Sequence, residues 1–125
     1  MGLRRGAVVR RSHDRGAVAV ESALAALVLV AVLLAAAWCL LAVLAQLGVG
    51  EAARAGARVA ARGEPDAAVA AEAHRLVAGA DVDVRRDGDH VIVEVQRSLA
   101  PPGPLGSWGS VHLRAQAEAL VESAP

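Results

Sequence analysis

The 125-residue chain contains no phenylalanine and no tyrosine, only two tryptophans, and a single cysteine, Cys39. Two aromatic rings offer almost no surface on which nucleic-acid bases can stack. One cysteine excludes both an internal disulfide and a cysteine metal cluster. Lysine is also absent, so all thirteen basic residues are arginine. These shortages argue against a nucleic-acid-binding protein and against a small domain stabilised by disulfides.

The net charge is zero, but the charges are unevenly distributed. Residues 1–16 carry five arginines and one aspartate, which gives +4, whereas residues 17–125 carry eight arginines and twelve acidic residues, which gives −4. The basic part is therefore a short N-terminal leader, and the rest of the chain is acidic. Because an acidic surface repels phosphate, we expect no nucleic-acid partner.

The longest apolar run, residues 23–45, contains no charged residue, no proline and no glycine. As an α-helix it would extend about 34 Å, enough for a hydrocarbon core of about 30 Å. A single segment in lipid must pair its own backbone groups, so it can only be a helix. The alternative is the core helix of a soluble domain, but this chain has little else to cover so apolar a helix. The run therefore predicts one transmembrane helix in a lipid bilayer.

Arginines on either side of the run predict its orientation. Five arginines lie in residues 1–16, and three, Arg54, Arg58 and Arg62, follow the run. Arginines close to a membrane helix favour the cytoplasmic side. The excess in the leader predicts a cytoplasmic N-terminus and an extracytoplasmic C-terminal domain.

The border between leader and apolar run carries a recognisable pattern. The basic leader ends in Gly16, Ala17 follows, and Glu21 stands fifth after the glycine. This arrangement resembles type IV prepilins. The resemblance implies that a prepilin peptidase cuts after Gly16, and that Glu21 pairs with the N-terminal amine of a neighbouring subunit. A charge within a transmembrane helix costs roughly 2.5–3.5 kcal/mol at its centre and less near an interface, so it is usually paired and functional.

The same border is also compatible with a chain that enters no pilus. Glu21 can simply lie at the headgroup level, where the helix macrodipole favours an acid near the N-terminus. A signal peptidase can instead cut after Ala45, releasing a small secreted binding module, although the run exceeds the usual length of a signal-peptide core. The chain can also remain unprocessed as a single-pass anchor.

A second pattern follows the apolar run. Arg54, Arg58 and Arg62 recur every fourth residue and form a basic face, while small residues at Ala52, Gly56 and Ala60 do the same on another face. A track of small residues lets two helices approach closely, which predicts a subunit-packing face; the alternative is a solvated helix striped with arginine.

The stretch from Ala52 to Arg58, AARAGAR, resembles the corresponding stretch of TadE-like proteins of the tight-adherence (Flp/Tad) pilus system. The resemblance implies a minor pilin or pseudopilin of the bacterial inner membrane, or of a surface pilus. The helical composition that continues past the apolar run predicts one long helix over residues 17–62. The implied partners are the prepilin peptidase, other pilins and the inner-membrane assembly platform.

Residues 63–125 predict a small α+β domain. Gly63 ends the long helix, and Asp66 is expected to cap a second helix that continues to about Ala78. Two antiparallel strands follow, in a hairpin around Asp87 and Gly88, with the second strand ending near Leu99. The later elements are a proline-rich loop over residues 100–106 and a third strand from Val111, for which a terminal helix over residues 113–122 is the alternative.

No pattern in the chain predicts chemistry. The four histidines lack ligand spacing, although His90 and His112 could approach each other across paired strands. No serine lies in a nucleophile-elbow context. We therefore expect no enzyme activity, no metal, no cofactor and no small-molecule substrate.

Overall fold

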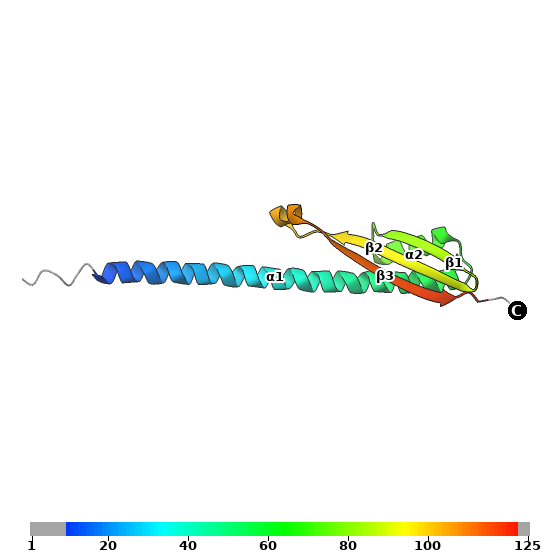
Figure 1. Ribbon diagram of the computed structural model, residues 1–125, viewed down its shortest axis with the longest axis horizontal. Coiled ribbons are helices and arrows are strands. Elements are labelled where there is room, and N and C mark those ends of the chain that lie inside the picture. The colour runs from blue at the N-terminus through cyan, green and yellow to red at the C-terminus, as the bar shows by residue number, and fades with distance from the viewer. Residues whose placement is uncertain (1–9, 123–125) are drawn as a thin grey trace, which may run out of the picture. The chain divides into compact units, whose positions relative to one another are not determined.

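The computed structural model describes the backbone of residues 10–122 and the side chains of residues 14–122. Residues 1–9 of the expected basic leader lie outside the described residues. The elements are α1 (Arg10–Ala61), α2 (Asp66–Leu76), β1 (Asp81–Asp87), β2 (His90–Leu99), the short 3₁₀ helix η1 (Gly103–Trp108) and β3 (Val111–Leu120) (Figure 1). The chain divides between Trp38 and Cys39 into two compact units, and α1 contributes to both.

Helix α1 begins earlier than its sequence predicts. It begins at Arg10 rather than at Ala17, so Gly16 and Ala17 both lie within it. A single glycine costs a helix about 1 kcal/mol, which does not end a helix whose neighbouring residues favour it. At the other end, α1 stops at Ala61, and Gly63 adopts the positive φ of 77° that the expected glycine stop requires.

In the first unit, the apolar side chains of α1 are exposed. The large side chains from Val18 to Leu34 are between 52% and 69% exposed, and no residue in the most apolar window is buried. By length and composition α1 is able to cross a membrane. The core helix of a soluble protein would instead be mostly buried, so this surface is unlike that alternative.

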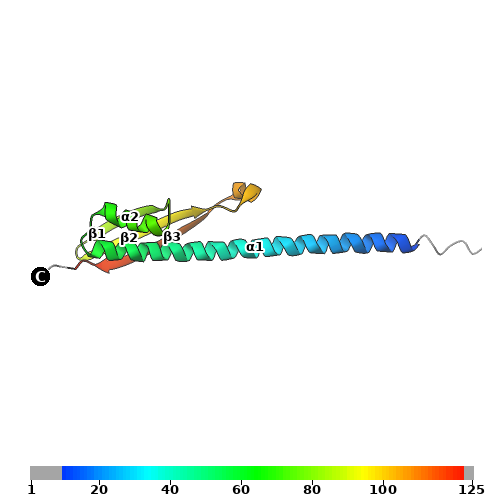
Figure 2. The same ribbon diagram turned by 180° about the vertical axis from the view of Figure 1, so that it is seen from behind.

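The second unit is a two-layer α+β domain. Its three strands form one antiparallel sheet in the order β1-β2-β3, and α2 and the C-terminal part of α1 lie on the same face of that sheet (Figures 1 and 2). Every second residue of β2 faces the helices, and Val91, Val93 and Val95 are fully buried. The opposite residues of β2 face outward, as the period of two requires.

The last element is a strand and not a terminal helix. Strand β3 pairs with β2 from Leu99–Val111 at one end to His90–Leu120 at the other. Leu113 is buried, and alternate alanines of β3 pack against the core. A third strand gives the sheet enough width to cover two helices, which an isolated hairpin lacks.

Asp66 does not cap helix α2, contrary to the prediction from the sequence. Pro65 occupies the N-cap position without a side-chain hydrogen bond, and Asp66 is the first helical residue. Its carboxylate instead forms an ion pair with Arg86 on β1. The helix also ends earlier than Ala78, because Val77 is already extended, with a φ of −133°.

The track of small residues on α1 packs inside the domain. Ala52, Gly56 and Ala60 are all buried, and a Cβ added at Gly56 would lie 3.0 Å from Val93 Cγ1 and 3.3 Å from Val69 Cγ1. The close approach that the spacing predicts is real, but the neighbour is the chain's own sheet and α2. This corrects the expectation of a subunit-packing face, since the face is already covered.

Replacing Gly56 tests this packing. We expect Gly56→Leu to lower the free energy of unfolding of the second unit by about 1–3 kcal/mol, because a larger side chain overpacks the contact with both valines. Pulse proteolysis in urea, with the protein in a mild detergent, measures the change.

Gly50→Ala is the matched control in the same helix. A Cβ there meets only the Arg54 guanidinium, at 3.8 Å, so the gain in helix propensity should raise stability by up to about 1 kcal/mol. Equal effects of the two substitutions would show that Gly56 is not a site of close packing.

Candidate functional site

Glu21 lies at the N-terminal end of an apolar stripe on α1, here called the Glu21 stripe. Its carboxylate shares a helical face with Leu24, Ala25, Val28, Leu29 and Val32, which recur at the three- and four-residue spacing of one side of a helix. All six residues are exposed. Within the described side chains, no ion pair involves Glu21. The stripe therefore joins an acidic group to an uncovered apolar surface.

Gly16 and Ala17 lie one turn before this stripe, on exposed helix. Nothing lies within 4 Å of a Cβ built on Gly16, so the side of the helix at this residue is open. The peptide bond between the two residues is helical, because α1 begins at Arg10. A peptidase that cuts here would have to act on a locally unwound chain, since a protease normally binds its substrate extended.

The basic face of the second unit lies on the outside of α1. Arg54, Arg58 and Arg62 are exposed, as their spacing predicts, while the small residues between them face the core. Arg54 pairs with Glu51 one turn earlier. A pair this exposed contributes little to stability. The basic face is thus available to solvent or to a partner.

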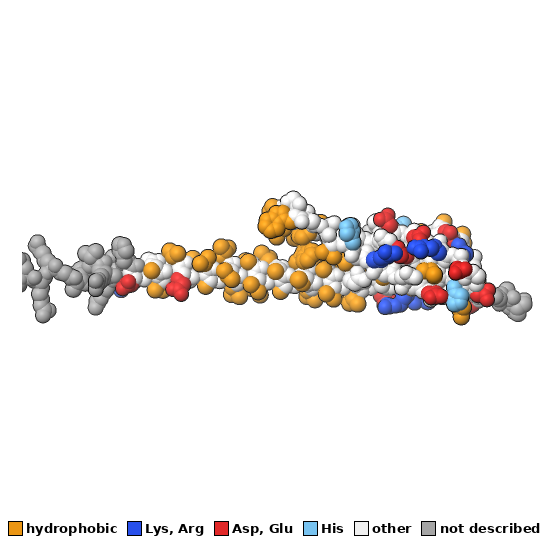
Figure 3. Space-filling view, in the orientation of Figure 1, with side chains coloured by type: hydrophobic (Ala, Val, Ile, Leu, Met, Phe, Trp, Pro, Cys, Tyr) orange, Lys and Arg blue, Asp and Glu red, His pale blue; other side chains and the backbone are white. Residues whose placement is uncertain are grey.

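Acidic and basic side chains gather on the outer face of the sheet (Figure 3), and Glu94 is at the centre of a charged network there. Although Glu94 points away from the helices, it is only 3% exposed, because neighbouring long side chains cover it. Arg114 on β3 and Gln96 donate hydrogen bonds to its carboxylate, and the Arg85 guanidinium on β1 lies 3.7 Å away. The network therefore links all three strands.

These contacts lower the pKa of Glu94. The hydrogen bond from Arg114 is the largest cause, followed by the one from Gln96, and attraction to Arg114 and Arg85 adds to them against the opposing effect of burial. A carboxylate that is ionised and fully paired is suited to holding strands together, not to acid–base chemistry. The alternation of β2 places Glu94 on the outer face, and its burial depends on the register that brings Arg114 close to it.

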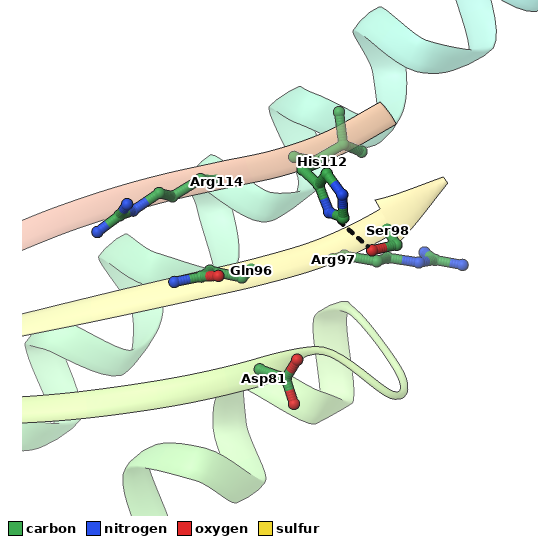
Figure 4. A pocket seen from close by; sticks show the side chains of 7 residues that line it. Asp81, Gln96, Arg97, Ser98, His112 and Arg114 are labelled. Atoms are coloured by element: carbon green, nitrogen blue, oxygen red, sulfur yellow. Dashed lines mark hydrogen bonds between the residues drawn. The ribbon is translucent and has the colours of Figure 1, made fainter. Parts of the chain in front are cut away.

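The second polar feature is a depression at the end of β1 (Figure 4). It has a volume of about 450 Å³ and is lined mainly by polar side chains: Asp81, Gln96, Arg97, Ser98, His112 and Arg114. Ser98 Oγ lies 3.0 Å from His112 Nδ1, and both residues are exposed. Nucleophilic catalysis needs a third group to orient the histidine, and none is bonded to His112 among the described residues. The pair is a cross-strand polar contact.

His90 and His112 do not approach each other across the paired strands. The register of β2 and β3 pairs His90 with Leu120 and His112 with Ser98, at opposite ends of the two strands. His90 instead contacts Glu118. Among the described residues, no group of three or more potential metal ligands gathers at one place.

The pH dependence of stability tests the role of Glu94. Because its pKa is lowered in the folded protein, the ionised carboxylate stabilises the fold above the unfolded pKa, near 4.5, and this contribution is lost as the pH falls through the folded value. We expect Glu94→Gln to reduce stability at neutral pH and to flatten the loss of stability below pH 4.5, measured as urea midpoints across the acid range.

Glu72→Gln is the control, because Glu72 also has a lowered pKa, mainly through a hydrogen bond from Arg75, but lies in a surface pair on α2. Glu72→Gln should change the pH dependence of the urea midpoint in the acid range much less than Glu94→Gln does. If Glu94→Gln left the pH dependence of the urea midpoint in the acid range unchanged, the central role of this carboxylate would be contradicted.

Comparison with known proteins does not assign this arrangement to a family. No protein-family model, no curated protein and no solved structure matches the chain. The resemblances to type IV prepilins and to TadE-like proteins therefore depend on two short stretches, Gly16 to Glu21 and Ala52 to Arg58 respectively.

Proposed function

We propose that the chain is a single-pass membrane protein, with α1 crossing the bilayer and the α+β unit on the extracytoplasmic side. The observation that carries this proposal is the exposure of the large apolar side chains of α1 from Val18 to Leu34. Burying such a surface in lipid removes it from water, at a gain of roughly 25 cal/mol for each Å². The arginines of the leader support a cytoplasmic N-terminus.

Within this class we propose a TadE-like minor pilin or pseudopilin of a tight-adherence pilus. Gly16, Ala17 and Glu21 supply the prepilin-like border, and the Ala52 to Arg58 stretch supplies the second resemblance. The partners in this proposal are a prepilin peptidase, other pilins and the inner-membrane assembly platform. The protein acts mechanically, by holding its domain at the membrane until its helix packs with neighbours.

The packing surface in this proposal is the Glu21 stripe. The small residues at Ala52, Gly56 and Ala60 are occupied by the chain's own domain, so they cannot receive a second helix. The stripe from Glu21 to Val32 is exposed and apolar, with one acid at its start. After cleavage at Gly16, the new amine of Ala17 in a neighbouring subunit would neutralise that acid, which favours one axial register.

The mature N-terminus tests the proposed processing. When the chain is expressed with a prepilin peptidase, mass spectrometry of the membrane fraction should find Ala17 as the first residue, and Gly16→Leu should abolish the cleavage. A mature protein beginning at Gln46 would favour a secreted module instead, and one beginning at Met1 or Gly2 an unprocessed anchor. Either result would contradict the pilin proposal.

Substitution of Glu21 tests the proposed register. We expect Glu21→Ala to be inserted and cleaved normally but to be depleted from sheared pilus fractions, because the neighbour's amine loses its partner. Quantitative immunoblots of the membrane and sheared fractions measure the ratio.

Glu51→Ala is the control, since Glu51 lies on the same helix in an exposed pair with Arg54, outside the apolar run. The ratio of Glu51→Ala in the sheared fraction to that in the membrane fraction should match the ratio of the unsubstituted protein. Equal incorporation of Glu21→Ala would contradict the register role.

A further inference from the structure

The loop between β2 and β3 presents an apolar tip to solvent. This tip loop, residues 100–110, has Trp108 86% exposed and Leu105 51% exposed. Tryptophan is normally among the more buried residues on average, so an almost fully exposed one calls for a physical reason. The stretch from Leu99 to Val111 contains no charged residue, whereas the remainder of the domain is densely charged. Figure 3 shows this contrast as an orange tip beside the charged sheet.

The conformation of the tip loop is fixed by its own residues. Pro102 precedes the 3₁₀ helix η1, in which Ser107 Oγ donates a hydrogen bond to the Pro104 carbonyl at 2.8 Å. A Cβ on Gly106 would lie 2.8 Å from the Pro101 carbonyl oxygen, so only glycine allows this tight fold-back. The loop is therefore organised so that its apolar side chains stay displayed instead of collapsing onto the domain.

Contacts within the second unit locate the tip loop along α1. Gln46 Nε2 donates to the Arg114 carbonyl at 2.9 Å, and at the far end the Glu122 amide donates to the Ala61 carbonyl at 3.0 Å. The chain from β3 to Glu122 therefore runs alongside α1, with Arg114 beside Gln46. Val111 lies three residues before Arg114 on the strand, about 10 Å, in the direction of Cys39. Figures 1 and 2 show the hairpin extending past α2 in this direction.

That direction leads back into the apolar run. Gln46 is the first polar residue after Ala45, so in the proposed span it lies near the outer boundary of the hydrocarbon. The tip loop lies on the apolar side of that boundary. Arg97, His112 and Arg114 line the polar depression immediately behind the loop, and Arg97 has no acidic partner among the described side chains. In Figure 4 its side chain extends toward the end of β2 that leads into the loop.

We infer that the tip loop inserts Leu105 and Trp108 into the outer leaflet of the bilayer that α1 spans, and that Arg97 faces the lipid phosphates. This inference rests on the proposed membrane span. Tryptophan is enriched at membrane interfaces, where its ring contacts both the acyl chains and the headgroups, and arginine beside it meets the phosphates. The loop gives the domain a second attachment besides α1, which restricts how the domain tilts on the membrane surface.

The two tryptophans, in a chain without tyrosine, allow a direct test. The full chain is reconstituted in phosphatidylcholine–phosphatidylglycerol vesicles, as Trp38→Phe to observe Trp108 alone and as Trp108→Phe to observe Trp38 alone. Trp108 should lose most of its fluorescence when the lipid carries bromine near the headgroup, and should resist quenching by aqueous iodide. Trp38 should be quenched by bromine deeper in the acyl chains.

A charge in the loop provides the matched variant. Leu105→Asp, made in the Trp38→Phe background, should shift the Trp108 emission to longer wavelength and abolish its quenching by bromolipid. Resistance of each variant to proteolysis in urea, equal to that of the unsubstituted protein, confirms that the domain is folded.

The outcomes separate this inference from the proposed function. If Trp38 is quenched by deep bromine while Trp108 is quenched by iodide and not by bromolipid, the span stands and the loop insertion is wrong. If Trp38 is not quenched by bromolipid, the proposed span is wrong and the loop insertion falls with it.

Discussion

The close packing of α1 against the sheet is the contact on which the folded domain depends. Gly56 lets the backbone of α1 approach Val93 of β2 and Val69 of α2, and the alanines on either side continue this contact along the helix. Most of the core consists of valine and alanine, so there is little side-chain volume to fill a wider gap. A small domain of small residues must bring its backbones close together to exclude water.

This contact makes α1 a helix with two environments. Its C-terminal part is a structural component of the domain, because residues from Val49 to Ala60 are part of the hydrophobic core. Its N-terminal part has no cover within the described chain.

The outer face of the sheet has no helix against it and is stabilised differently. Glu94 is buried by arginines from both neighbouring strands, so charged side chains perform the covering that apolar residues perform on the inner face. Such a surface does not attract a further apolar layer. The uncharged tip loop at one end of the same sheet is the exception, because it exposes Leu105 and Trp108.

The sequence by itself determined four features: the apolar helix, the glycine stop at Gly63, the hairpin around Gly88 and the alternation that buries Val93. These depend on local backbone preferences and on periodicity, which neighbouring residues carry. Only the tertiary structure decided what each face contacts. The track at Ala52, Gly56 and Ala60 packs on its own sheet, Glu94 is buried beside Arg114, and Trp108 is displayed at a hairpin tip. Small residues at this spacing allow any element to pack closely, so the spacing does not say which element does. Cross-strand partners depend on the register of the strands, which a local sequence pattern does not contain.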